Sequence, residues 1–347
     1  MKVENLPKIK LGAYPTPLEK MSRLSALFGK GDLFIKRDDL TGPALGGNKT
    51  RKLEYLLQDA VSQGCTAVLT VGGPQTNHGR ATAAAAINLG LKPILVLSGN
   101  KPEYLSGNLT LDAMMGVDII FDNCHMEEAV KTAVEHYENQ GEKVYFIPMG
   151  GSDHIGTLGY IMAVPELMRQ IEELGIGAKY LVCSSGSMGT YAGLNLGARY
   201  FGAAFKVIGI PTKPLEDSYV IQAADFINQI SARYDMGVTV RADELLIRNG
   251  PADKPYSGAA YNEPDPLTRK YIYMMAKTQG IILDPTYTGK SFRGFCEMLE
   301  TGEIEAGSEP IYLHTGGMAA VWTKEHLDAM QGELFDNCRI TAYTPKI

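Results

Sequence analysis

Short apolar runs alternate with amphipathic stretches along almost the whole chain. Runs of four or five residues rich in Val, Ile and Leu predict buried strands, and apolar residues spaced three and four apart predict helices. In the first half of the chain the predicted strands are 33–36, 67–71, 93–97, 118–121 and 144–147. The predicted helices between them are 50–58, 81–89, 108–115 and 126–139. Repeated βα alternation is typical of a parallel sheet covered by helices.

A second series of the same kind follows the glycine pair at 150–151. A helix is predicted over 155–174, and further strands over 180–183, 206–210 and 311–314. Further helices are predicted over 191–200, 219–234, 266–278 and 289–300. The predicted fold class is therefore α/β, with two open parallel-sheet domains flanked by helices and a boundary near Gly150. Ligands of such folds bind beyond the carboxyl ends of the strands.

Composition narrows the class of protein. The chain has 347 residues, 45% of them hydrophobic and 21% charged, which is enough for two domains. A net charge of −6, with basic residues spread along the chain, argues against a general nucleic-acid or membrane-surface binder. The five cysteines are widely separated and lack a CxxC pair, which favours reduced thiols. With no apolar run long enough for a leader or a membrane span, we expect a cytoplasmic protein without a metal site.

The stretch 46–54 contains the first candidate for chemistry. Gly46 and Gly47 permit a tight turn and a close backbone approach to a ligand, and Asn48 is predicted to cap the following helix. Lys49 then lies on the first helical turn, where the helix dipole and two basic neighbours disfavour another positive charge. A neutral lysine amine attacks a carbonyl, so a Schiff base could form here. The alternative is a set of basic residues on a solvated helix start.

Two loops at predicted strand ends could bind anions. In the loop 72–78, backbone amides at a helix start could hold a carboxylate, with hydrogen bonds from Thr76 and Asn77. An ordinary helix cap after a glycine turn explains this loop equally well, and His78 alone is weak evidence for catalysis. The loop 183–190 places small residues and hydroxyls before another helix, which favours a cradle for a single phosphate ester. A structural Ser/Gly turn is the alternative.

Two C-terminal segments, 284–290 and 313–317, add hydroxyl groups at helix starts and strand ends. The Tyr287 hydroxyl could shuttle a proton, and a threonine hydroxyl could bond to a ring nitrogen. Taken singly, each segment is explained as a turn or as packed aromatic surface. A reactive lysine combined with a monophosphate cradle points to pyridoxal 5'-phosphate.

The sequence at this point resembles a known family. The runs 35–42 (IKRDDLTG) and 46–54 (GGNKTRKLE) are similar to the D-cysteine desulfhydrase and aminocyclopropane-carboxylate deaminase family of fold type II pyridoxal phosphate enzymes. The resemblance continues in order through 107–108, 150–151, 156–160, 186–193, 283–290 and 314–317 and covers essentially the whole chain. It implies a tryptophan synthase β-like fold, with a larger domain of residues 1–51 and 160–347 and a smaller inserted domain of 52–159. It also implies a homodimer that acts on a small amino acid.

The resemblance implies a role for each matching residue. Lys49 would carry the cofactor as a Schiff base, Asn77 would bond its phenolic oxygen, and Thr288 or Thr315 would face its ring nitrogen. The cofactor's phosphate would lie against Lys52 and the loop of Gly186, Ser187, Met188, Gly189 and Thr190. Thr76, Asn77 and His78 would receive the substrate carboxylate, and Tyr287 and Tyr261 would flank the substrate as proton donors or acceptors.

The two branches of the family differ beside the ring nitrogen. The deaminase branch has an acidic residue where this chain has Thr288 and an apolar residue where it has Thr315. A carboxylate would keep the nitrogen protonated and strengthen the electron sink, which a threonine cannot do. The chain therefore resembles the desulfhydrase branch, in which Lys49 removes the α-proton and a β-leaving group departs. D-cysteine would yield pyruvate, ammonia and hydrogen sulfide.

Two departures from the family pattern affect the choice of substrate. Thr76 stands where serine is usual and adds a methyl group to the substrate loop, and Met188 replaces a glycine, which would strain a backbone with positive φ. D- or L-cysteate is an alternative substrate, because His78, Arg80 and a helix N-terminus could meet an extra anion. The same motifs are compatible with aminocyclopropane-carboxylate deamination, with amino-acid racemisation and with a catalytically silent phosphometabolite binder.

Overall fold

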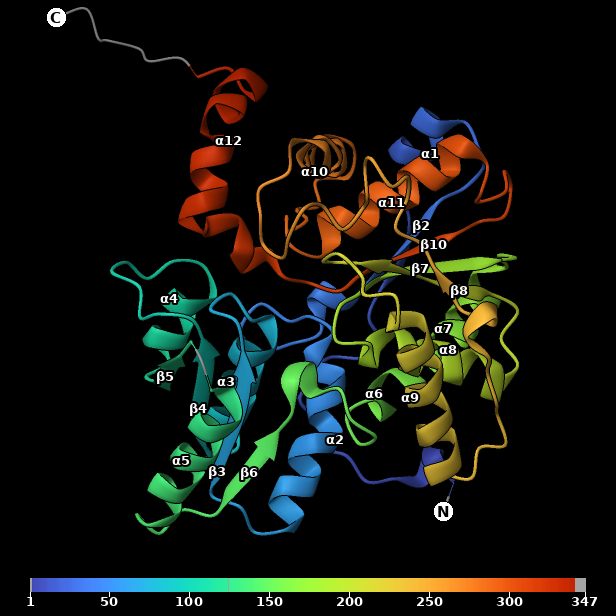
Figure 1. The fold of residues 1–347 in the computed structure, drawn as a ribbon. Coiled ribbons are helices and arrows are strands. Elements are labelled where there is room, and N and C mark those ends of the chain that lie inside the picture. The colour runs from blue at the N-terminus through green and yellow to red at the C-terminus, as the bar shows by residue number, and fades with distance from the viewer. Residues whose placement is uncertain (1, 124, 341–347) are drawn as a thin grey trace, which may run out of the picture.

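Two sheets form the framework of the molecule (Figure 1). The structure is a computed structural model, and it describes residues 2–123 and 125–340. The six-stranded sheet has the order β1 (Leu18–Lys20), β2 (Phe34–Arg37), β10 (Ile311–His314), β7 (Tyr180–Ser185), β8 (Lys206–Pro211) and β9 (Leu246–Ile247). The four-stranded sheet has the order β5 (Asp118–Asp122), β4 (Lys92–Ser98), β3 (Ala67–Gly72) and β6 (Val144–Ile147). The predicted α/β class with two sheets is confirmed.

Every neighbouring strand pair is parallel except β1 with β2. Parallel strands are buried on both faces, and all six residues of β3 are accordingly buried. Because β2 pairs with β10, the start of the chain belongs to the six-stranded sheet, which a single boundary near Gly150 would not allow. The domain limits at 51/52 and 159/160 stay a prediction, and their outermost positions, Met1 and 341–347, lie outside the described residues.

Helices cover both sheets (Figure 1). Around the four-stranded sheet they are α2 (Lys49–Ser62), α3 (Asn77–Asn88), α4 (Asn108–Met114) and α5 (Met126–Glu138). The others are α1 (Ser22–Phe28), α6 (Leu158–Ile161), α7 (Ala163–Leu174), α8 (Gly189–Phe201), α9 (Tyr219–Arg233), α10 (Pro266–Gln279), α11 (Thr288–Thr301) and α12 (Lys324–Asn337). Figure 1 shows α2 in the middle of the molecule, between the four-stranded sheet and α6.

The predicted helix over 155–174 is wrong as one element. It is divided into α6 and α7 at Met162, because Pro165 has no N–H to bond the carbonyl of Ile161. The edge strands β1 and β9 were not predicted, since two or three residues carry too little pattern to indicate a strand. The helices α1 and α12 were also not predicted.

The structure bears on two further predictions from composition. Among the described residues, it has no helix that is both long and apolar enough to cross a bilayer. Cys65, Cys183 and Cys296 are buried and Cys338 is exposed, and these four form no disulfide with one another. Cys124 lies outside the described residues.

Candidate active site

A cavity of about 350 Å³ lies at the carboxyl ends of strands from both sheets. Its walls include most of the residues predicted for the site: Lys49, Thr76, Asn77, His78, Gly186, Ser187, Met188, Thr190, Tyr261, Tyr287 and Thr315. Three predicted residues, Lys52, Gly189 and Thr288, are not part of its lining. The fold therefore brings into one cavity side chains that the sequence separates by more than two hundred positions.

The turn before α2 fixes the backbone of Lys49. Gly46 has a φ of +58°, and a Cβ there would lie 2.3 Å from the carbonyl oxygen of Asp39, so no other residue fits. The predicted cap is wrong, because the Asn48 side chain makes no capping bond. Its amide nitrogen instead donates to the Thr190 hydroxyl at 2.9 Å, which links the Lys49 turn to the phosphate loop.

The amine of Lys49 is buried beside a neutral acceptor. It donates a 3.2 Å hydrogen bond to the carbonyl oxygen of Gly150. Burial lowers its pKa from 10.5 to about 8. The expectation that Arg51 would also lower this pKa is not met, since Arg51 points into a separate buried cluster and pairs with Asp38 and Glu166.

Lys52 lies behind the predicted phosphate loop. Its amine donates to the Gly150 carbonyl at 3.1 Å and to the Ser152 hydroxyl at 2.9 Å, and Ser152 in turn contacts the Ser187 hydroxyl at 2.8 Å. A Cβ at Gly189 would lie 2.6 Å from both the Lys52 amine and the Ser152 hydroxyl. Burial, and then the charge of Lys49, lower the pKa of Lys52 well below its ordinary value.

The loop 186–190, which is predicted to bind the phosphate, contains a strained residue at the start of α8. Met188 has a φ of +64° and a ψ of −40° and directly precedes the helix. The positive φ confirms that a residue other than glycine is strained at this position. Met188 is the centre of a tight turn in which the Gly189 N–H donates to the Ser187 carbonyl at 2.8 Å.

The start of α3 forms the opposite wall of the cavity. Thr76 caps the helix by accepting from the Gly79 N–H at 3.2 Å, and the Asn77 side-chain oxygen accepts from the Asn108 amide at 2.9 Å. That bond directs the amide nitrogen of Asn77 away from Asn108 and leaves it as a donor. His78 is locally bonded, with its Nε2 2.9 Å from the Thr70 hydroxyl. Burial and then the two nearby lysines lower the pKa of His78 well below its ordinary value, so the ring is neutral.

Arg80 is not available to a ligand, so its predicted contact with an extra anion is wrong. The residue is buried, and its guanidinium donates to the Asn108 side chain and to the Gly46 carbonyl, both at 3.1 Å. It does not line the cavity. Its contacts instead tie α3 to the glycine turn before Lys49.

The two threonine candidates for the ring nitrogen have different environments. The Thr288 hydroxyl is fully buried, donates to the Asp284 carboxylate at 2.6 Å and accepts from the Asp284 N–H at 2.8 Å. It is part of the cap of α11 and does not line the cavity. Thr315, which follows β10, does line it. Of the two predicted positions, only Thr315 faces the cavity.

Two tyrosine hydroxyls meet at one wall of the cavity. The oxygens of Tyr261 and Tyr287 lie 2.7 Å apart, with the rings edge to face. Burial raises the pKa of Tyr261 to about 12 and raises that of Tyr287 well above its ordinary value. Both hydroxyls are therefore protonated at neutral pH, and each can donate a proton while the other accepts.

Several residues of the lining were not predicted. Ser98 ends β4, and Thr212 and Lys213 follow β8. A signal for them was present, because each lies at the carboxyl end of a predicted strand. Lys213 is exposed and brings a further cation to the cavity.

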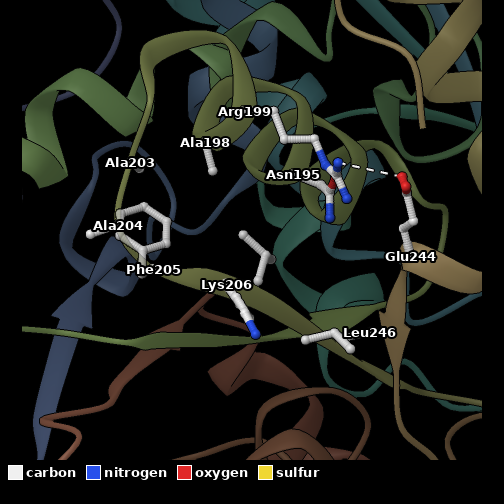
Figure 2. A pocket seen from close by; sticks show the side chains of 10 residues that line it. Asn195, Ala198, Arg199, Ala203, Ala204, Phe205, Lys206, Glu244 and Leu246 are labelled. Atoms are coloured by element: carbon white, nitrogen blue, oxygen red, sulfur yellow. Dashed lines mark hydrogen bonds and ion pairs between the residues drawn. The ribbon is translucent and has the colours of Figure 1, made fainter. Parts of the chain in front are cut away.

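A second cavity, of about 400 Å³, contains none of the predicted residues (Figure 2). It lies at the far end of α8 and β8, where Arg199 faces Glu244 at 3.5 Å and Lys206 begins the strand. The two elements run from here to the first cavity, but the second cavity lacks a reactive lysine or an amide-rich turn.

Comparison with known proteins decides the family. The model of the pyridoxal-phosphate dependent enzyme family matches residues 9–316. The chain belongs to this family. It is 36% identical over 324 residues to a "Putative 1-aminocyclopropane-1-carboxylate deaminase" of Pyrococcus abyssi, covering 92% of this chain and 94% of the relative. A 1-aminocyclopropane-1-carboxylate deaminase of Burkholderia vietnamiensis is 35% identical, covering 92% and 97%.

Solved structures agree with this family assignment. A crystal structure described as that of an ACC deaminase homologue has a TM-score of 0.84 and 34% identity, covering 97% of this chain and 98% of the other. Threonine deaminase isoform 2 of Solanum lycopersicum has a TM-score of 0.63 at 16% identity, covering 94% and 84%, and shows the fold alone. The protein is thus a fold type II pyridoxal phosphate-dependent enzyme.

The residues of the cavity fit this cofactor. Within the described ranges 2–123 and 125–340, neither Lys49 nor Lys52 forms an ion pair, so two buried amines lack a carboxylate partner. A phosphate dianion would supply the missing charge beside Lys52, and the absent side chain at Gly189 lets the Lys52 amine and the Ser152 hydroxyl approach the start of α8. An aldehyde carbon would meet the Lys49 amine.

Proposed function

We propose that this enzyme is a β-elimination lyase that converts D-cysteine to pyruvate, ammonia and hydrogen sulfide. The observation that carries the proposal is the absence of Asp and Glu from the cavity lining, within the described part of the chain, where Thr315 is the one of the two predicted threonines that lines the cavity. A hydroxyl leaves the ring nitrogen less basic than a carboxylate would. A thiol leaves more readily than a carbon–carbon bond opens, so this environment suits elimination. The D configuration comes from the family resemblance.

The residues of the cavity have complementary roles in this proposal. Pyridoxal phosphate, when bound, supplies a carbonyl for the substrate amine and an electron sink for the charge left on Cα. The amide groups at the start of α3, with Thr76 and Asn77, hold the substrate carboxylate. The Lys49 amine accepts the proton from Cα. A hydroxyl of the Tyr261 and Tyr287 pair donates a proton to the departing sulfur. Water then releases ammonia and leaves pyruvate.

Lys52, Ser187 and Thr190 bind the phosphate group in this proposal, and Asn77 bonds the phenolic oxygen. The Asn77 assignment is supported by its amide nitrogen, which the bond to Asn108 leaves as a donor. His78 transfers no proton in this proposal and contributes only to the shape of the cavity, since its neutral ring is bonded to Thr70. A homodimer and a cytoplasmic location belong to the same proposal.

Two other substrates have specific support. Aminocyclopropane-carboxylate is favoured by the names of the relatives. Cysteate is favoured by Lys213, whose exposed amine could pair with a sulfonate, a role that Arg80 cannot fill. With cysteate, Lys49 would again take the α-proton, whereas aminocyclopropane-carboxylate has no proton on its fully substituted Cα.

One experiment separates the three substrates. Purified holoenzyme is assayed with D- and L-cysteine, D- and L-cysteate and aminocyclopropane-carboxylate, and pyruvate and 2-oxobutyrate are measured. We expect pyruvate from D-cysteine at the highest kcat/KM. The proposal fails if aminocyclopropane-carboxylate, giving 2-oxobutyrate, is the best substrate. Borohydride reduction and peptide mapping should place a phosphopyridoxyl group on Lys49, and a Lys49→Arg variant is the control.

A further inference from the structure

Tyr261 lies on a long segment that has no regular secondary structure of its own. Residues 248–265 connect β9 with α10 and contain neither helix nor strand. Segments of this kind are generally more mobile than helices and strands. The Tyr261 hydroxyl is nevertheless placed 2.7 Å from that of Tyr287.

Two cations of α11 hold this segment. The Arg293 guanidinium donates to the carbonyls of Lys254 and Pro255 at 2.9 and 3.3 Å. One turn earlier, the Lys290 amine donates to the carbonyls of Ser257 and Ala260 at 2.6 and 2.9 Å. The same helix begins directly after Tyr287, so one rigid element carries one tyrosine and holds the loop of the other.

Lys290 makes a third bond that reaches another wall of the cavity. Its amine donates to the carbonyl of Thr212 at 2.9 Å, and Thr212 lines the cavity beside Lys213. On the other side of Tyr261, the Asn262 side chain accepts from the Thr286 hydroxyl at 2.6 Å. Tyr261 is thus held through both of its neighbours in the chain.

Packing alone does not account for this lysine. Lys290 is fully buried, and in the described part of the chain it forms no ion pair. Burying an ammonium group without a carboxylate partner is costly unless each N–H finds an acceptor. Burial lowers its pKa to about 8, so at neutral pH the amine still has three donors for the three carbonyls. A hydrophobic side chain would fill the same space without ordering the loop.

We propose that Lys290 is a positioning residue for the tyrosine pair, which fixes the Tyr261 hydroxyl against Tyr287 through the carbonyls of Ser257 and Ala260. It touches neither substrate nor cofactor. The role of the tyrosines in proton transfer rests on the proposed function, whereas the ordering of the loop does not.

Hydrogen exchange tests the ordering of the loop without any substrate. The N–H groups of Tyr256 and Ser257 bond to Asn249, and that of Gly258 bonds to the Pro255 carbonyl, so the segment has protected amides. In the holoenzyme, Lys290→Met should speed their exchange about tenfold or more, because local opening costs less once three bonds are lost. Tyr261→Phe should leave the exchange of these amides unchanged. Lys36→Met is the control for loss of a buried lysine elsewhere, since Lys36 also has three acceptors, although one of them is the Glu166 carboxylate, with which it forms an ion pair. It should leave exchange in 256–258 unchanged.

A double-mutant cycle tests whether Lys290 affects catalysis through Tyr261. It uses whichever of the amino acids assayed above is the best substrate. Tyr261→Phe should lower kcat about 10²-fold, within the range of general acid–base catalysis. Lys290→Met should lower kcat about tenfold in the wild type and less than about twofold in the Tyr261→Phe background, with KM little changed. Lys36→Met should show no such dependence. Where Lys290→Met does not fold, Lys290→Gln keeps two donors and should give the same pattern with smaller losses.

Two results would overturn the inference. One is unchanged exchange in 256–258 after removal of Lys290. The other is an equal loss of kcat in both backgrounds, which would make Lys290 a structural residue only. If no substrate of the panel is turned over, the proposed function fails while the exchange result still decides whether Lys290 orders the loop.

Discussion

The amine nitrogen of Lys49 lies 3.2 Å from the carbonyl oxygen of Gly150, a residue 101 positions further along the chain. The same oxygen accepts from Lys52 at 3.1 Å. One neutral carbonyl therefore serves two buried amines. A carbonyl offsets only part of the cost of burying a charge, so the protonation equilibrium of Lys49 is shifted toward the neutral amine. This contact prepares the amine for reaction with an aldehyde.

Cofactor uptake by the apoenzyme should follow the protonation of Lys49. With a pKa of about 8, the ammonium form dominates at lower pH and the reactive amine becomes dominant above it. The rate of pyridoxal phosphate uptake should rise about tenfold per pH unit below pH 8 and level off above it. Stopped-flow absorbance measures this rate, and Lys49→Arg should show no slow covalent phase. A rate that still climbs steeply at pH 10 would contradict the lowered pKa.

Replacing Lys52 should weaken cofactor binding without lowering the stability of the apoenzyme. Lys52→Met removes a charged partner of the phosphate, and hydrogen bonds to charged groups contribute about 1.5–3 kcal/mol, so the cofactor Kd should rise about 10- to 100-fold. The apoenzyme should lose no stability, because a buried amine without a carboxylate is removed. Fluorescence titration gives the Kd, and thermal melting of the apoenzyme gives the stability. Ser152→Ala is the milder control. A marked fall in apoenzyme Tm would count against this explanation.

The backbone strain at Met188 can be measured by comparing the stabilities of Met188→Gly and Met188→Ala. At an ordinary helical position Gly is about 1 kcal/mol less favourable than Ala. With a φ of +64°, the order should reverse, and Met188→Gly should be more stable than Met188→Ala by about 1 kcal/mol. Both variants lose the same side-chain packing, so their difference isolates the backbone. Urea unfolding of the apoenzymes provides the comparison, and equal midpoints would show that the residue is not strained.

The two threonines should respond differently to the same isosteric change. Thr288→Val breaks two buried bonds to Asp284 and should lower the free energy of unfolding by about 1–3 kcal/mol. Thr315→Val should leave stability almost unchanged, and it should lower kcat about tenfold if its hydroxyl bonds the ring nitrogen. Denaturant melts and steady-state kinetics on both variants test this pair. Reversed effects would assign the ring nitrogen to Thr288.

Much of the fold could be predicted, because the strands that matter are buried on both faces. The segment 311–314, whose four residues are all buried, was predicted with its observed bounds, and β3, β4, β7 and β8 differ from their predictions by one or two residues at an end. Buried parallel strands are nearly continuous apolar runs, a signal that is local. The edge strands β1 and β9 have two or three residues and depend on their neighbours for pairing, so no local signal existed.

The candidate site could be predicted as a set of loops but not as a set of contacts. Lys49, the 186–190 loop and the Tyr287 segment were found because glycine turns and helix starts are local features. The partners of Asn48 and Arg80 were not, since each bonds to an atom that lies far away in the sequence. Ser98 and Lys213 were overlooked although they lie at predicted strand ends.

The sequence by itself determined the α/β class, and it indicated Lys49 and a loop for a single phosphate as candidates, because these follow from local pattern and residue chemistry. Only the tertiary structure decided which threonine faces the cavity, that burial rather than Arg51 lowers the pKa of Lys49, and that Lys290 holds the loop of Tyr261. Each of these depends on where distant segments meet. The direction of a side chain in a loop, and the solvent around a charge, are set by those distant contacts.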